Sequence, residues 1–377
     1  MDVVKRPGSK LLGLEIIRFA AAFAVLVWHY QHFFYMADAP VDFVREQQPF
    51  YGLFRLFYEY GFYGVQVFWC ISGFIFFWKY RDILSSRSMS LGKFALLRFS
   101  RLYPLHFVSL LLVAGLQAVY FKSHGYYMVY QFNDLKHFGL QLFMASNWGF
   151  QNGESFNGPI WSVSIEVLIY LGFYLGLTLL GKSALINIAM VAGCAIAKAL
   201  GLHSPILDCF AVFYIGGLSA IALRHFSGTR LHQVFTYAAW TVLIVVPVGA
   251  SITGIASRGF FAPLFLMFYV PILLYVAATD FQLPSRLQRM VEILGNLTYA
   301  SYLIHFPIQL CVAMAFGAMG IAIPGYSPLL FIGFLGGTLI ASYFVFKDFE
   351  MPAQRFLRKA YQAQRPTHET LRSGRPG

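Results

Sequence analysis

The chain has 377 residues, of which 58% are hydrophobic and only 12% charged, and its mean hydropathy is +0.62. A soluble domain carries about twice that charged fraction, and the long continuous apolar runs argue against a β-barrel, so the composition predicts an all-α polytopic membrane bundle. The net charge of +12 does not indicate nucleic-acid binding, because the basic residues stand at the ends of apolar runs, where they orient membrane helices.

Ten apolar segments are predicted to cross the membrane. They run at about 12–34, 61–79, 102–121, 160–181, 184–200, 206–223, 235–252, 260–278, 299–317 and 329–347. An even number places both chain ends on one side, and the surplus of lysine and arginine there predicts that both ends are cytoplasmic. We expect one membrane domain over residues 1–360 and a disordered, polar tail over residues 361–377.

The first apolar segment, residues 12–34, carries Arg18 and His29, which a lipid-facing helix should not carry. Ionisable groups inside a membrane span usually face the bundle interior or a water-filled cavity. The two residues are eleven apart, so they fall on nearly the same helix face, about 16 Å apart along the axis. We interpret them as one wall of an intramembrane reaction site. The alternative is a buried polar pair that only holds helices together.

Two connections on the expected outer side, residues 35–60 and 122–159, are long. Long loops in compact domains are often functional. The second of them is polar and aromatic, and its residues 135–146 are expected to form a short helix at the membrane surface. Both connections are therefore candidates for contact with a substrate outside the membrane.

The second apolar segment contains small residues, Gly61, Gly64 and Gly73, where another helix can approach closely. Helix packing is the favoured interpretation of these glycines. Ser72, which precedes Gly73 in the middle of the segment, is a weaker candidate for contact with a ligand.

Basic residues precede the third apolar segment, in the stretch KFALLRFSRLYP. Arg98 and Arg101 are three apart and share a helix face, and Lys93 lies further toward the start of the same helix. Arginine is well suited to bidentate contacts with phosphate. Taken alone, the residues favour simple anchoring at the cytoplasmic surface. Because Arg18 is expected on the same side, we also consider a docking site for a phosphate-carrying cytosolic donor.

Glu166 lies one turn inside the fourth apolar segment, with Ser162 on the same face. A carboxylate at that depth needs a partner. His29 is expected at a similar depth, so Glu166 is predicted to orient its imidazole and stabilise the protonated form. The alternative is a structural ion pair. In the ninth segment, His305 precedes Pro307, which frees a backbone carbonyl, and a hydrogen-bonded structural role is favoured for this histidine.

The joint order of these motifs resembles the acyltransferase type 3 family of integral-membrane acyltransferases. That family includes bacterial enzymes that O-acetylate exopolysaccharides, lipopolysaccharides and nodulation oligosaccharides. The resemblance covers nearly the whole chain and rests on the Arg18–His29 pair, GVQVFWCISGF at 64–74, RFSRLYP at 98–104, WSVSIE at 161–166, SYLIHFP at 301–307 and FEMP at 349–352. Gln66 departs from the pattern, since many members carry Asp there, and this departure bears on the substrate more than on activity.

The resemblance implies transfer of an acyl group, usually acetyl, from cytoplasmic acyl-CoA to a hydroxyl of a cell-surface or exported glycan, by a multi-pass protein of the bacterial inner membrane. The catalytic residues that it implies are His29, Arg18 and Glu166. The residues for the donor are Arg98, Arg101 and Lys93. Further candidates for contact with a substrate are Ser72, Trp161, Ser162 and His305. The expected partners are acyl-CoA as co-substrate, a hydroxyl acceptor and the lipid bilayer, with no bound cofactor or metal.

Two mechanisms are open for His29. It could act as a general base for the acceptor hydroxyl, or it could carry the acyl group as a short-lived acyl-imidazole. The rival class of function is a transporter or flippase for a glycan or small molecule, because many spans with buried ionisable residues also suit a carrier. The absence of an internal repeat and the one-sided basic cluster favour the enzyme.

Overall fold

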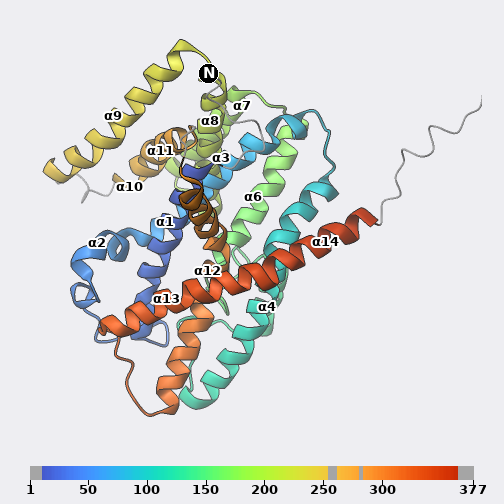
Figure 1. Cartoon of the computed structure of the whole chain (residues 1–377). Helices are drawn as coiled ribbons and strands as arrows, with labels where there is room; N and C mark the ends of the chain where they lie inside the picture. The colour runs from blue at the N-terminus through green and yellow to red at the C-terminus, as the bar shows by residue number, and fades with distance from the viewer. Residues whose placement is uncertain (1–10, 254–260, 280–282, 364–377) are drawn as a thin grey trace, which may run out of the picture.

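A computed structural model describes residues 11–253, 261–279 and 283–363, and these form a bundle of helices (Figure 1). In chain order the helices are α1 (Leu12–His29), α2 (Tyr51–Tyr60), α3 (Gly64–Ser85), α4 (Leu91–His124), α5 (Leu135–Leu142), α6 (Ile160–Leu179), α7 (Ala184–Ala199), α8 (Pro205–Phe226), α9 (Arg230–Thr253), α10 (Phe261–Leu264), α11 (Val270–Ala277), α12 (Ser285–Ala318), α13 (Pro328–Phe344) and α14 (Met351–Ala363). The predicted tail lies, from residue 364 on, outside the described residues.

Eight helices in the described part of the chain are long and apolar enough to cross a membrane, and each overlaps one of the expected spans. The two remaining expected spans, 184–200 and 260–278, coincide with shorter apolar helices, Ala184–Ala199 and Ala262–Ala277. The all-α membrane architecture is therefore confirmed. The count of ten crossings and the side of the chain ends stay predictions.

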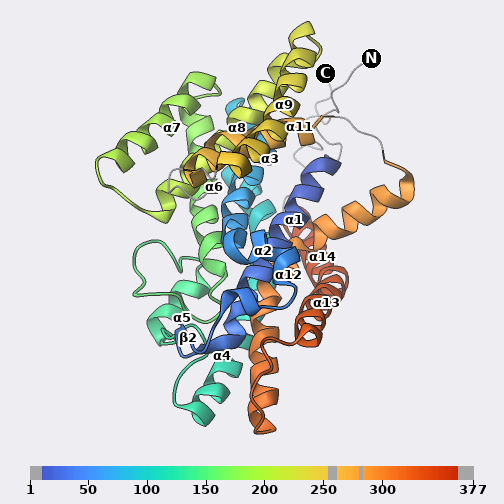
Figure 2. The same ribbon diagram turned by 90° about the vertical axis from the view of Figure 1, so that its left-hand side faces the viewer.

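The core of the bundle is built from helices that are distant in sequence. α1 packs against α12 and α3, and α3 packs along α8. Figure 2 shows α1, α3 and α12 at the centre, with α7 on one side and α13 and α14 on the other. The π-helix η6 (Val345–Glu350) joins α13 to α14, and the two form one long arm across α4 (Figure 1). Segments from the whole chain thus surround α1.

The first long connection is more ordered than expected. It contains the antiparallel strands β1 (Tyr35–Met36) and β2 (Ala39–Pro40), followed by the helix α2. α2 was not expected, because its ten residues are too few to cross a membrane, and Tyr58 is its one fully buried residue. In the second connection, the short helix α5 falls within the residues where the sequence predicts one.

Glycines set the closest helix contact in the bundle, between α3 and α8. A Cβ on Gly73 would lie 1.8 Å from the carbonyl oxygen of Phe213, and one on Gly216 would lie 2.0 Å from that of Cys70. No side chain fits at either distance, so the two backbones touch only because both residues are glycine. The packing interpretation of Gly73 is confirmed.

Gly73→Ala is therefore expected to destabilise the fold by about 1–3 kcal/mol, because α3 and α8 must move apart to admit the methyl group. Thermal unfolding in detergent measures the change. Gly115→Ala on α4 is the matched control, since a Cβ there meets nothing within 4 Å. Equal melting of the two variants would show that the α3–α8 contact does not limit stability.

Candidate active site

Two cavities lie along α1. The first, of about 360 Å³, contains Arg18, Lys79, Arg98 and Arg101, and we call it the basic cavity. The second, of about 460 Å³, contains His29 and is called the histidine cavity. Arg18 and His29 were expected to form one wall of a single site. They instead belong to different cavities, about 16 Å apart along the helix axis.

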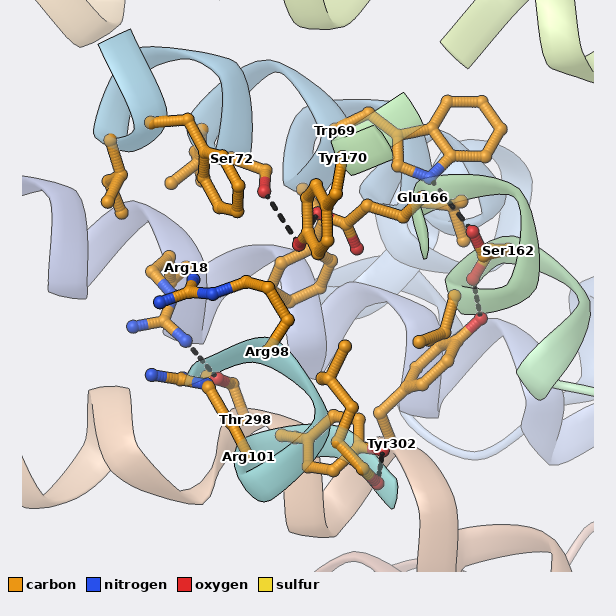
Figure 3. A pocket seen from close by; sticks show the side chains of 18 of the residues that line it. Arg18, Trp69, Ser72, Arg98, Arg101, Ser162, Glu166, Tyr170, Thr298 and Tyr302 are labelled. Carbon is orange, nitrogen blue, oxygen red and sulfur yellow. Dashed lines mark hydrogen bonds between the residues drawn. The ribbon is translucent and has the colours of Figure 1, made fainter. Parts of the chain in front are cut away.

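The cations of the basic cavity differ in how firmly they are held. Arg18 donates to Glu15 Oε2 at 2.8 Å and to Thr298 Oγ1 at 3.2 Å. Arg98 donates to the Tyr80 hydroxyl at 2.7 Å and lies over the Phe76 ring. Arg101 makes no hydrogen bond or ion pair with the described residues. Figure 3 shows the three arginines close together on one side of the cavity. Of the three, Arg101 is the one whose donors are not used by a described residue.

One predicted cation is absent from this cavity and another was missed. Lys93 is exposed on the first turn of α4 and does not line the cavity. Five residues separate it from Arg98, which rotates it by about 140° away from the arginine face. Lys79 on α3 does line the cavity. Its position at the end of an apolar segment indicated only membrane anchoring, so nothing in the sequence distinguished it from other anchoring residues.

Glu166 lies in the basic cavity and not beside His29. Its Oε1 accepts a hydrogen bond from the Tyr170 hydroxyl at 2.6 Å. Tyr170 has one hydroxyl hydrogen, which goes to Glu166, so Ser72 donates to the Tyr170 oxygen at 3.1 Å (Figure 3). The expected Glu166–His29 pair is therefore not formed. Similar depth in two helices does not determine the direction in which their side chains point. Glu166 lies on the side of α6 that faces α3.

His29 is oriented by its own helix. Its Nδ1 lies 2.9 Å from the carbonyl oxygen of Val25, one turn earlier. A carbonyl can only accept, so Nδ1 carries the hydrogen in the neutral ring and Nε2 keeps its lone pair. Among the described residues Nε2 has no hydrogen-bond partner, and His29 is 8% exposed and lines the histidine cavity. The arrangement leaves a basic nitrogen available to a ligand.

Two further histidines surround His29. The ring of His305 is 4.8 Å from it between centroids, and the ring of His32 is 4.9 Å away. Gln309 joins the group, because its amide donates to the His29 carbonyl at 2.8 Å and its oxygen lies 3.2 Å from His32 Nδ1. His305 is fully buried and lines neither cavity. His305 therefore packs behind the His29 ring, where it limits the positions that ring can take.

A thin partition separates the cavities. Trp69 lines the basic cavity and Trp161 the histidine cavity, and their rings meet edge to face with centroids 5.7 Å apart. Val65 lines both cavities. Ser162, next to Trp161, faces the basic cavity and donates to the Tyr302 hydroxyl at 2.7 Å, since that hydroxyl itself donates to the Pro159 carbonyl. Consecutive residues of α6 thus reach opposite chambers.

The family model for the acyltransferase domain matches residues 11–347, which include the helices around both cavities. The chain belongs to the acyltransferase type 3 family. No curated protein and no solved structure matches it. With its apolar helices, the chain is a membrane acyltransferase, and the resemblance found in its motifs is confirmed.

The acyltransferase also has functional candidates that the motifs did not indicate. Glu154, in the connection before α6, lines the histidine cavity and makes no hydrogen bond with the described residues. Water reaches this carboxyl through the cavity, yet the surrounding protein removes most of its hydration, and this desolvation raises the pKa of Glu154 to about 7. Asp38, in the turn between β1 and β2, lines the same cavity. The length of the two connections was the only signal in the sequence.

Proposed function

We propose that this membrane acyltransferase moves an acyl group, normally acetyl, from a CoA thioester in the basic cavity to a hydroxyl of a glycan in the histidine cavity. The observation that carries the proposal is the Nε2 lone pair of His29, which faces a cavity while Nδ1 is held by a carbonyl. The cations of the basic cavity suit the phosphates of CoA. The partition is thin enough for a slender pantetheine arm to pass once the indole rings move apart.

In the proposed reaction, His29 Nε2 removes the proton of the acceptor hydroxyl as its oxygen attacks the thioester carbonyl carbon. The carbon–sulfur bond breaks, and the CoA thiolate takes the proton back from the imidazolium. The products are an ester and the free thiol, so atoms and charge balance.

Arg18 and Glu166 have donor-side roles in this proposal. Both line the basic cavity. Arg18 is held by Glu15 and Thr298, and Glu166 by Tyr170, so each presents a fixed group to the donor. We assign them, with Ser72 and Ser162, to positioning the thioester arm. His29 alone handles the proton.

The proposed topology follows from the basic residues at the helix ends. The basic cavity opens to the cytoplasm, where acyl-CoA is made, both chain ends are cytoplasmic, and the histidine cavity opens to the far side of a bacterial inner membrane. This orientation delivers the acyl group across the bilayer while CoA remains in the cytoplasm.

The test uses membranes that contain the protein, labelled acetyl-CoA and glycan isolated from the same cells. The proposal predicts label in ester linkage on the glycan, released by mild alkali. Label that stays on CoA, together with glycan movement that does not depend on acetyl-CoA, would favour the carrier instead.

A further inference from the structure

The histidine cavity has an uneven charge. Two of its lining residues, Asp38 and Glu154, carry carboxyl groups, and its described lining contains neither lysine nor arginine. The basic cavity differs, because its four cations outnumber the three carboxyl groups that line it, those of Glu15, Glu166 and Glu292. A ligand of the histidine cavity therefore meets negative groups and no fixed positive charge. The remaining titratable groups that line it are His29, His32 and two tyrosines, Tyr35 and Tyr130.

Flat aromatic surfaces make up much of the rest of the wall. The indole rings of Trp28 and Trp161 and the ring of Phe132 line it, together with the amides of Gln66 and Gln131. An aromatic face can bury the apolar C–H surface of a ring-shaped ligand. The amides can donate to hydroxyl oxygens and accept hydroxyl hydrogens. This combination suits a molecule with an apolar face and many hydroxyl groups on its edge.

Glu154 is placed where it can determine which of these hydroxyl-rich ligands bind in the histidine cavity. Its carboxyl shares the cavity with His29 and with the hydroxyl-bearing side chains of Tyr35 and Tyr130. A carboxylate has only acceptor sites, about four of them, and can hold hydroxyl hydrogens on both oxygens. With no partner among the described residues, those sites are available to a ligand.

We propose that the acceptor is a neutral sugar. Glu154 is the specificity-determining residue, which accepts hydrogen bonds from the hydroxyl groups of this sugar. Together, Glu154 and Asp38 exclude glycans that carry carboxylate or phosphate groups. The inference rests on the proposed function in taking the histidine cavity as the acceptor site. An anionic sugar there would lose its hydration and face two like charges without a counter-ion. A neutral sugar has no charged group to dehydrate and meets no repulsion between like charges, and it gains charge-assisted hydrogen bonds.

The test measures binding of oligosaccharides to the purified protein in lipid nanodiscs by calorimetry at pH 8, without acyl-CoA. Two oligomers of equal length are compared, one of neutral hexoses and one in which uronic acids replace alternate hexoses. The neutral oligomer is expected to bind at least about tenfold more tightly, the effect of one hydrogen bond to a charged group. Equal or tighter binding of the acidic oligomer to the wild-type protein overturns the inference.

Variants then assign the preference to Glu154. Glu154→Gln is expected to lower the affinity for the neutral oligomer about tenfold and to raise the affinity for the acidic oligomer. The ratio of the two affinities therefore becomes smaller. Glu46→Gln, the same substitution at an exposed residue outside the cavity, should leave both affinities unchanged. An unchanged preference in Glu154→Gln, with a melting temperature like that of Glu46→Gln, overturns the role of Glu154.

Acyl transfer to the same two oligomers separates this inference from the proposed function. Neutral preference in binding without transfer to either oligomer would count against the proposed function, while the charge selectivity that Glu154 gives the histidine cavity would stand. Transfer that is equally fast to both oligomers would refute the inference and keep the proposed function.

Discussion

Replacing His29 with alanine is expected to lower the rate of acyl transfer by about 10²–10⁴-fold, the usual contribution of a positioned general base. The substitution removes the Nε2 lone pair that faces the histidine cavity and leaves the basic cavity intact. The turnover rate should fall while the affinity for acyl-CoA is unchanged. Labelled acetyl-CoA and a saturating acceptor measure the first quantity, and calorimetry with CoA measures the second.

His203→Ala is the control for this result, because His203 is exposed on the connection between α7 and α8. It should transfer at the wild-type rate. If His29→Ala also keeps near wild-type transfer, neither the base nor the acyl-carrier mechanism is correct. If instead it loses CoA affinity together with turnover, His29 acts through the structure of the bundle.

Arg101→Ala is expected to raise the KM for acyl-CoA about 10- to 100-fold, with a smaller change in kcat. Arg101 lines the basic cavity without a hydrogen bond or ion pair among the described residues, as Lys79 does, so its guanidinium is available for bidentate contact with a phosphate. One hydrogen bond between charged groups contributes about 1.5–3 kcal/mol, which corresponds to this range of affinity. Initial rates at varied acyl-CoA and fixed acceptor provide the measurement.

Arg289→Ala provides the comparison, since Arg289 is exposed on α12 outside the cavity and should leave the KM unchanged. Arg98→Ala is less informative, because Arg98 also supports Tyr80 and the Phe76 ring, and its loss should lower the melting temperature as well. If Arg101→Ala and Arg289→Ala have the same KM for acyl-CoA, acyl-CoA does not bind through Arg101 in the basic cavity.

The sequence predicted the helices well because long apolar runs have few alternatives in a membrane. It also predicted that Arg18, Arg98 and Arg101 would come together, because each stands near the same end of its helix. α2 was missed, since its aromatic residues are not continuous enough to be read as a span. Its fold depends on packing against α1, which no local pattern contains.

The sequence identified several residues of the site but not the contacts that these residues make. His29 was identified from the unusual position of an imidazole in an apolar helix. Its orienting partner was expected to be Glu166 and is the Val25 carbonyl, a backbone group that sequence patterns do not reveal. Glu154 was missed because a carboxylate in a polar loop is ordinary until the fold places it in a cavity. Side-chain facing depends on how helices rotate in the bundle, and depth alone does not define that rotation.

The central claim is that donor and acceptor occupy opposite faces of one protein and meet across the partition between Trp69 and Trp161. Sealed vesicles containing the protein, loaded with labelled acetyl-CoA inside and given acceptor glycan only outside, test it directly. We expect label on the outside glycan with wild-type protein, none with His29→Ala, and none when both substrates are confined inside. Transfer that occurs only when both substrates share a compartment would contradict it.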